Sequence, residues 1–167
     1  PKLDYRDKEL RQLGAQLLLS EVLEYIIKGL GVEPVVNGTA ITDANALEYR
    51  SKGQPVALEM LDGIADVAYT MYWNALAFGL PLEEAYELVC DNNLEKFVSL
   101  EGKDWSPGPV ERDLWNLNRG IEWPESVVRV DVVSVSGVPY AVGRDSSGKV
   151  RKPSSYSSVD LTPLIAE

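Results

Sequence analysis

Three carboxylates recur on one face of a mainly apolar segment, LEMLDGIADVAYTMYW, residues 58–73. On a helix with about 100° per residue, Glu59, Asp62 and Asp66 fall within an arc roughly 60° wide. The same arc then continues through Tyr69, Thr70 and Trp73. A solvent-facing stripe does not normally run from acids into tryptophan. The spacing therefore predicts a helix face that offers carboxylate oxygens beside an aromatic patch.

A segment nearer the N-terminus has a similar pattern, because Glu21 and Glu24 share a helix face with Leu13 and Leu17. If the two helices pack side by side, several carboxylates converge, and burying them unpaired is costly. Mg²⁺ and Mn²⁺ prefer such all-oxygen sites, so the pattern indicates a divalent cation. The simpler alternative is that both faces are solvated, since Glu and Asp pairs at helical spacing are common.

The composition excludes several kinds of catalytic site and of binding partner. The chain has 167 residues and no histidine, which excludes Ser-His-Asp and Cys-His catalysis and histidine-based zinc sites. With 26 acidic against 16 basic residues, the net charge of -10 disfavours nucleic acid and anionic membranes as partners. The single cysteine, Cys90, excludes an intramolecular disulfide and favours a reducing compartment. The polar N-terminus and the absence of a long apolar run predict a cytoplasmic protein.

Helical periodicity and breakers predict helices over 7–30, 42–49, 55–78 and 82–100. Residues 103–126 hold three prolines and three tryptophans and predict a loop with a helical turn around 113–118. Residues 127–142 are rich in β-branched residues around Ser136-Gly137, which predicts a β-hairpin. The tail is basic between Arg144 and Lys152. No internal repeat is visible, and one domain over 1–167 is expected.

Several motifs resemble those of the all-α nucleoside triphosphate pyrophosphohydrolases, the MazG-like family. Its signature is E-E-x-x-E on one helix and E-x-x-D on the next but one; here S-E-V-L-E occupies 20–24 and E-M-L-D-G-I-A-D occupies 59–66. N-N-L-E-K-F at 92–97 is similar to the family's N-x-x-K element. G-K-V-R-K-P-S-S-Y-S-S-V-D-L at 148–161 is similar to the ending of phage-type members. Ser20 departs from the pattern, because the family has an acid there.

The resemblance covers residues 10–100 and 143–161 and implies an all-α helical bundle. Residues 103–142 match nothing in the family and are expected to form a loop and β-hairpin insertion, followed by a basic C-terminal tail at 143–167. It implies a homodimer or dimer of dimers that hydrolyses a nucleoside triphosphate between the α- and β-phosphates, with Mg²⁺ or Mn²⁺. The implied metal ligands are Glu21, Glu24, Asp62 and Asp66, with Glu59 just outside them. Glu21, Glu24 and Asp66 are the candidate catalytic acids.

Two further sets complete the predicted site. The predicted phosphate contacts are Asn93, Lys96, Arg144, Lys149, Arg151, Lys152 and Tyr156. The alternative interpretation is a polar helix end for Asn93 and Lys96 and a soluble, mobile C-terminus for the four basic residues. Tyr156 either folds over the site or simply anchors the tail. The predicted nucleobase pocket is Leu13, Gln16, Leu17, Tyr69, Trp73 and Asn74, although these residues do not define the base. The phage-like ending favours dGTP, hydrolysed to dGMP. The alternatives are a house-cleaning dUTP or dCTP pyrophosphatase and a non-enzymatic acidic helical interaction protein.

Overall fold

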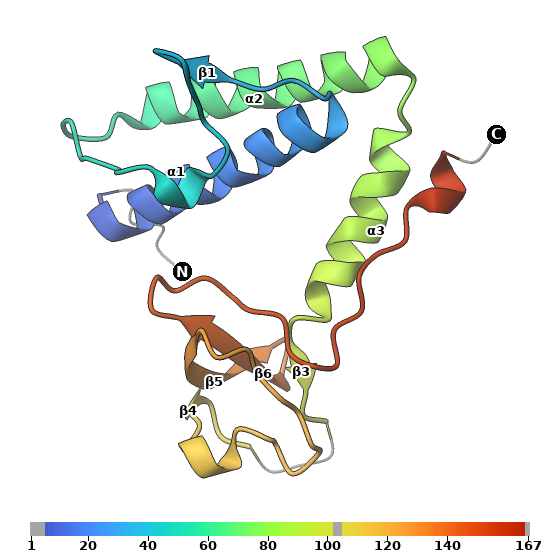
Figure 1. Ribbon diagram of the computed structural model, residues 1–167. Helices are drawn as coiled ribbons and strands as arrows, with labels where there is room; N and C mark the ends of the chain where they lie inside the picture. Colours follow the sequence, from blue (N-terminus) through green and yellow to red (C-terminus); the bar gives the residue numbers. More distant parts are fainter. Residues whose placement is uncertain (1–5, 102–104, 166–167) are drawn as a thin grey trace. The chain divides into compact units, whose positions relative to one another are not determined.

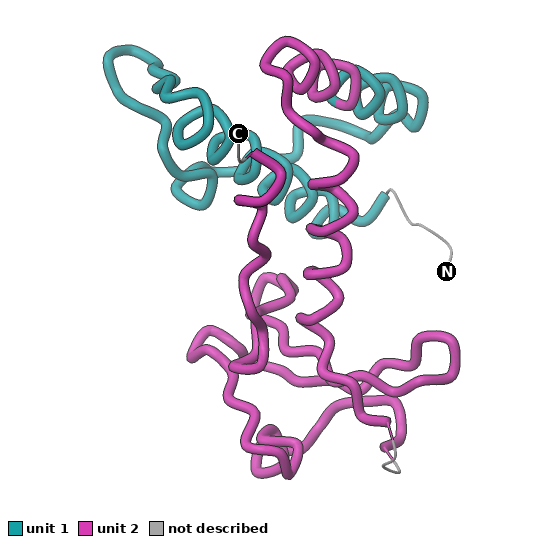
Figure 2. Tube along the Cα trace, turned by 90° about the vertical axis from the view of Figure 1, so that its right-hand side faces the viewer, with its two compact units in different colours: residues 1–67 teal, residues 68–167 magenta. Residues whose placement is uncertain are grey.

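The computed structural model describes residues 6–101 and 105–165. The chain forms two compact units, residues 1–67 and 68–167, which Figure 2 shows in different colours. The boundary falls within helix α2, Ala57–Phe78, so this helix contributes to both units. Residues 103 and 104 of the predicted insertion lie outside the described residues.

Unit 1 begins with helix α1, Lys8–Glu24, where the Asp7 carboxylate accepts a hydrogen bond from the Leu10 amide at 3.0 Å. This N-cap satisfies one of the amides that the first helical turn leaves without a partner. A π-helical turn, Tyr25–Gly29, follows directly, so the predicted helix over 7–30 divides into two kinds of turn. A small antiparallel hairpin comes next, formed by β1, Val35–Val36, and β2, Thr39–Ala40.

The rest of unit 1 is held to α1 by side-chain contacts. The Gln12 amide donates to the Tyr49 carbonyl at 2.7 Å, and the Gln16 amide donates to Asn45 Oδ1 at 2.7 Å. The predicted helix over 42–49 is only a 3₁₀ turn, Ala44–Ala46. Asp43 caps that turn by accepting from the Asn45 amide at 2.8 Å. These bonds fix the segment after β2 along one side of α1.

Unit 2 contains helix α3, Leu82–Leu94, and a four-stranded antiparallel sheet in the order β3-β6-β5-β4 (Figure 1). The strands are β3, Val98–Ser99; β4, Gly108–Pro109; β5, Val127–Val135; and β6, Val138–Asp145. Short 3₁₀ turns, Arg112–Leu114 and Thr162–Leu164, lie between β4 and β5 and near the C-terminus. The long β5–β6 hairpin is the centre of the sheet.

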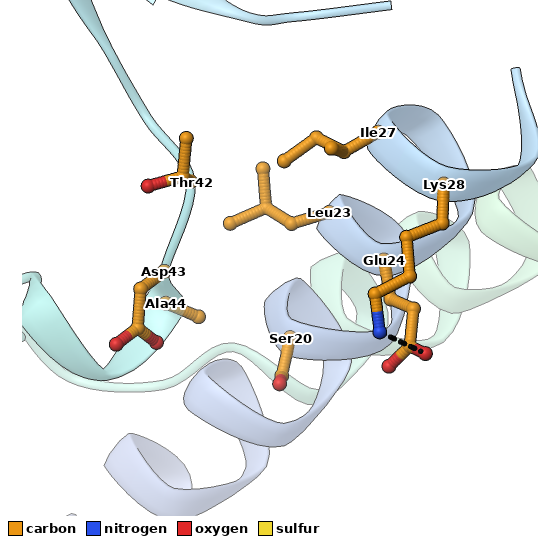
Figure 3. Close-up of a pocket in the computed structure, with 8 residues that line it drawn as sticks. All are labelled: Ser20, Leu23, Glu24, Ile27, Lys28, Thr42, Asp43 and Ala44. Carbon is orange, nitrogen blue, oxygen red and sulfur yellow. Dashed lines mark hydrogen bonds and ion pairs between the residues drawn. The ribbon is translucent and has the colours of Figure 1, made fainter. Parts of the chain in front are cut away.

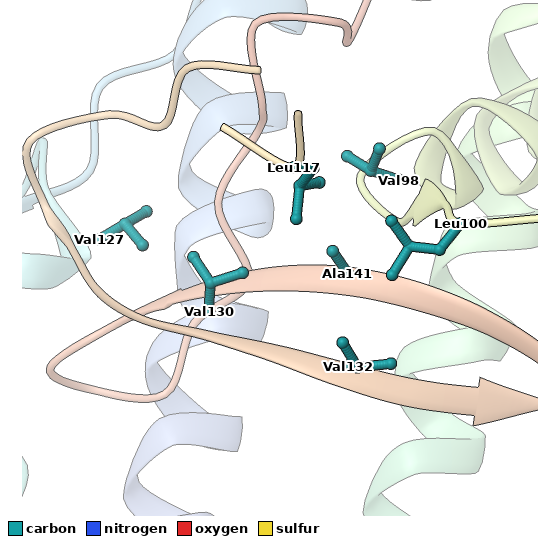
Figure 4. Close-up of a cluster of buried hydrophobic side chains, with 7 residues drawn as sticks. All are labelled: Val98, Leu100, Leu117, Val127, Val130, Val132 and Ala141. Carbon is teal, nitrogen blue, oxygen red and sulfur yellow. The ribbon is translucent and has the colours of Figure 1, made fainter. Parts of the chain in front are cut away.

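The main hydrophobic core of the described residues lies on this sheet (Figure 4). Its buried members are Val98, Leu100, Leu117, Val127, Val130, Val132 and Ala141. Trp105, Trp115 and Trp123 pack against it. The indole of Trp115 donates to the Val110 carbonyl at 3.0 Å, and that of Trp123 donates to the Trp115 carbonyl at 2.9 Å. Buried indole N–H groups thus have partners, as the burial of a polar group requires.

The predicted all-α fold is wrong, because the chain is a mixture of helices and antiparallel sheets. The hairpin over 127–142 was predicted as an insertion into a helical bundle, yet its side chains form the core of unit 2. The hairpin itself is confirmed: Val135 pairs with Val138 around Ser136-Gly137. Both turn residues have positive φ, 52° and 84°, as tight hairpin turns require. Over the described ranges, every helix is too short or too polar to cross a membrane.

Candidate functional site

The acids of α2 lie on the surface. Glu59, Asp62 and Asp66 are exposed, and so are most of the apolar side chains around them on the same helix. Tyr69 and Trp73, which continue the acidic face, are also exposed. These five side chains are therefore open to solvent along one helix. Exposed carboxylates are hydrated, however, and in this state they need no cation to offset burial.

The acids of α1 are exposed as well, and one of them already has a cationic partner. Lys28 Nζ lies 2.9 Å from Glu24 Oε1, and the two residues of this ion pair are four positions apart, about one helical turn. Glu21 is exposed on the same helix. Ser20, at the position of the family's first acid, is half-buried and lines a cavity instead. Exposed ion pairs of this kind contribute at most about 1 kcal/mol to stability.

The carboxylates do not form a metal centre within one chain. Over residues 6–101 and 105–165, there is no group of three or more Asp, Glu or Cys side chains placed to hold an ion. The candidate ligands Glu21, Glu24, Asp62, Asp66 and Glu59 consequently do not fit Mg²⁺ or Mn²⁺ as one chain presents them.

The six residues of the predicted base pocket belong to different units. In unit 1, Leu13 and Leu17 are half-buried, and the Gln16 amide donates a hydrogen bond to Asn45 Oδ1. In unit 2, Asn74 donates to the Thr70 carbonyl at 2.8 Å, while Tyr69 and Trp73 are exposed. Each half offers apolar surface, and the amide of Gln16 is already bonded within its own unit.

The two predicted phosphate contacts at the end of α3 bond to each other. Asn93 donates to the Val89 carbonyl at 2.8 Å and accepts from Lys96 Nζ. The neighbouring Asn92, which the sequence did not single out, is buried and fixes the C-terminal segment. Its amide donates to the Ser157 carbonyl at 2.7 Å, and its oxygen accepts from the Tyr156 hydroxyl. Tyr156 therefore anchors the tail on α3, which was the simpler of its two predicted roles.

Several residues of the predicted basic patch have structural partners. Arg151 Nε donates to Asp145 Oδ2 at 2.7 Å, and Arg144 Nη1 donates to the Gly148 carbonyl at 3.0 Å. The Lys152 ammonium lies 4.5 Å from the centroid of the Tyr156 ring. The Lys149 amide donates to Asp145 Oδ1 at 3.0 Å, while its side chain remains a candidate phosphate contact. Part of the predicted basic patch is thus a turn, residues 145–151, that hydrogen bonds to the Asp145 carboxylate stabilise.

Asp145 is the residue of this turn that sequence analysis missed. It is buried, and its Oδ1 also accepts from the amide and hydroxyl of Ser147 at 2.9 and 2.6 Å. Burial raises the pKa of Asp145, but the hydrogen bonds from Ser147, Arg151 and Lys149 outweigh it and hold the pKa below its usual value. The D-S-S-G sequence at 145–148 was the available signal, since aspartate followed by serine and glycine is typical of turns.

A cavity lies within unit 1, between α1 with its π-helical extension and residues 42–44 (Figure 3). Leu23 and Ile27 project from the helix toward that segment. Ser20, Glu24 and Lys28 complete the helical wall, and Thr42, Asp43 and Ala44 form the other. This cavity was not predicted, because it depends on the docking of residues 42–44 against α1.

Comparison with known proteins adds no relative: no protein-family model, curated protein or solved structure matches the chain.

Proposed function

We propose that the chain is a nucleoside triphosphate pyrophosphohydrolase of the MazG-like type, which converts a triphosphate, with dGTP as the first candidate, to the monophosphate and pyrophosphate. The observation that carries the proposal is the exposed face of α2. Glu59, Asp62 and Asp66 stand in line with Tyr69 and Trp73 on this face, all accessible to a ligand. An aromatic patch suits a nucleobase, and a nearby carboxylate suits the activation of water.

The charge of the proposed site sets a condition on activity. Carboxylates repel a triphosphate, so a substrate of that charge needs a compensating cation near the acids. The family resemblance points to Mg²⁺ or Mn²⁺. One chain does not gather the acids into a metal centre. The assay therefore includes the cation, and no residue of a single chain is assigned as its ligand.

The apolar surface of α2 supports a homo-oligomer as the active form. Leu58, Leu61, Tyr69, Tyr72 and Leu76 share one face of α2, and we call these five residues the α2 stripe. Their exposed fractions are 46–83%. Tyr69 lies where this stripe meets the acidic face. With 150–250 Å² for each aromatic side chain and somewhat less for leucine, the α2 stripe exposes roughly 600 Å². The largest apolar patch of a typical monomer is about 300–600 Å².

A second copy is the occupant that fits this surface best. A helix with apolar residues around most of its circumference needs neighbours on several sides. A standard interface buries about 800 Å² per partner, which the α2 stripe and its surroundings can supply. Assembly would also bring the acids of more than one chain into reach of one substrate. This is the route by which we propose that the carboxylates gather.

The test is a substrate screen with matched variants. The protein is incubated with each of the eight common nucleotides and Mn²⁺, and pyrophosphate release is measured. We expect release that EDTA abolishes and that the substitution Asp66→Asn abolishes without unfolding the protein. The control is Asp91→Asn, which changes an exposed residue of α3 and should retain turnover. Unchanged turnover in Asp66→Asn would remove Asp66 from the site, and no release from any nucleotide would reject the proposed activity.

A further inference from the structure

The cavity of unit 1 has the size of a single heterocycle. Its volume is about 160 Å³. An apolar cavity of about 150 Å³ can hold a benzene ring, whereas drug-sized ligands use about 300–1,000 Å³. A nucleobase fits such a space, and a complete nucleoside triphosphate does not. The sugar and phosphates of a larger ligand would have to lie outside.

The wall of the cavity suits a flat apolar surface. Leu23 and Ala44 are buried, at 4% and 2% exposure, and Ile27 is half-buried beside them. In Figure 3, the side chains of Leu23 and Ile27 point from the helix toward residues 42–44. A ligand with hydroxyl groups on every side, such as a sugar, would leave some of them against this apolar wall without hydrogen bonds. A planar ring with polar atoms only at its edge does not have this problem.

The charges at the rim exclude anions. Glu24 and Asp43 supply two carboxylates, and Lys28 supplies one ammonium. Hydrogen bonds from Asn45 lower the pKa of Asp43, so this carboxyl group stays ionised at neutral pH. With a net charge of minus one among the lining side chains, the cavity disfavours phosphate and carboxylate ligands. The ring that enters must be neutral or cationic.

The ion pair at the rim offers an acceptor beside a donor. Lys28 Nζ and Glu24 Oε1 are 2.9 Å apart, and the carboxylate has a second oxygen, Oε2, to present to a ligand. The complementary ligand edge has an N–H next to a carbonyl, which is the lactam edge of an oxopurine or a uracil. The Ser20 and Thr42 hydroxyls can donate or accept at the remaining positions.

We propose that this cavity binds a neutral, planar lactam heterocycle of nucleobase size, with Glu24 accepting from the ring N–H and Lys28 donating to the ring carbonyl. This inference does not depend on the proposed hydrolysis, because a nucleoside without phosphates is a sufficient ligand. It has one consequence for the proposed function: Glu24 contacts the ring edge and no longer belongs with Glu21, Glu59, Asp62 and Asp66, the acids that assembly is proposed to gather.

The test compares inosine with 1-methylinosine, in which a methyl group replaces the lactam N–H. Binding is followed through the methyl NMR signals of Leu23 and Ile27 in the full chain. We expect saturable shifts with inosine and uridine and none with 1-methylinosine. Glu24→Gln and Lys28→Met should each weaken inosine binding by roughly tenfold or more, because each removes one charge-assisted hydrogen bond. Ser20→Leu should abolish binding by filling the cavity.

Glu9→Gln and Lys8→Met, on the first turn of α1 and outside the cavity, are the matched controls and should bind inosine as the unaltered chain does. Equal binding of 1-methylinosine, undiminished binding by Ser20→Leu, or no saturable shift with millimolar inosine would each overturn the proposal.

Discussion

Gly143 in β6 lies against the indole of Trp123, and the fit leaves no space for a side chain. A Cβ at position 143 would be 2.4 Å from Trp123 Cε3. The indole is held in place by its hydrogen bond to the Trp115 carbonyl. We therefore predict that Gly143→Ala destabilises the protein by about 2–3 kcal/mol, in the range for overpacked cores. The midpoint of urea unfolding, followed by tryptophan fluorescence, measures the loss. Gly53→Ala, where a Cβ meets nothing within 4 Å, should change that midpoint little.

Asp145 makes the stability of the folded chain depend on pH. Its pKa is lower in the folded than in the unfolded chain, because the bonds from Ser147, Arg151 and Lys149 outweigh the effect of burial. A depressed carboxyl pKa stabilises the fold above the unfolded value, about pH 4, and this contribution is lost as the pH falls through the folded pKa. Asp145→Asn should cost about 2 kcal/mol at neutral pH, since the charge-assisted hydrogen bond to Arg151 is lost while the partly exposed guanidinium stays hydrated.

The free energies of unfolding of Asp145→Asn and the unaltered chain, compared near neutral pH and at about pH 3, check this prediction. The gap should narrow at the lower pH, because pH 3 lies below the unfolded pKa and the stabilisation by the ionised carboxylate is lost as the pH falls toward the folded pKa. A gap that is the same at both pH values would show that the ion pair with Arg151 is not its source. Asp113→Asn, in the exposed 3₁₀ turn, serves as the control.

At the scale of elements, α2 leads to a prediction about assembly. We expect light scattering at micromolar concentration to give the mass of a homodimer or a larger homo-oligomer. Leu61→Lys and Leu76→Lys, each within the α2 stripe, should shift the mass toward the monomer and lower turnover with it. Val32→Lys changes an exposed apolar residue outside α2 and should leave the mass unchanged. A monomeric mass for the unaltered chain would contradict both the assembly and the proposed gathering of acids.

Some elements could be predicted from local sequence, and others could not. The β5–β6 hairpin follows from β-branched residues around Ser136-Gly137, because a tight turn is a local property. The end of α3 was misplaced: the helical pattern continued through residues 95–100, but the helix ends at Leu94 and Val98 pairs with Ala141 in the sheet. That pairing joins residues far apart in the sequence, and helical periodicity contains no information about it.

At the scale of the whole molecule, contacts between distant parts of the chain also decide the site, and helical periodicity contains no information about them. Helical spacing placed Glu59, Asp62 and Asp66 on one face of α2, and it placed Glu21 near Glu24 on α1. Spacing along one helix does not determine which faces of different helices meet, so the convergence of acids was a hypothesis about packing. In the described part of one chain, those acids do not form a metal group. The turn at Asp145 was signalled by D-S-S-G, but its ion pair with Arg151 was not, because the fold of the turn brings that partner to it.

In the proposed reaction, water attacks the α-phosphorus of a nucleoside triphosphate. On α2, Tyr69 and Trp73 follow Asp66 within one or two turns, roughly 4–10 Å at 1.5 Å per residue. This span suits a nucleoside and its α-phosphate. Hydrolysis in ¹⁸O-labelled water with ³¹P detection tests the claim most directly. We predict that the label appears in the nucleoside monophosphate, with unlabelled pyrophosphate as the other product. Label in orthophosphate, together with a nucleoside diphosphate, would contradict the proposed function.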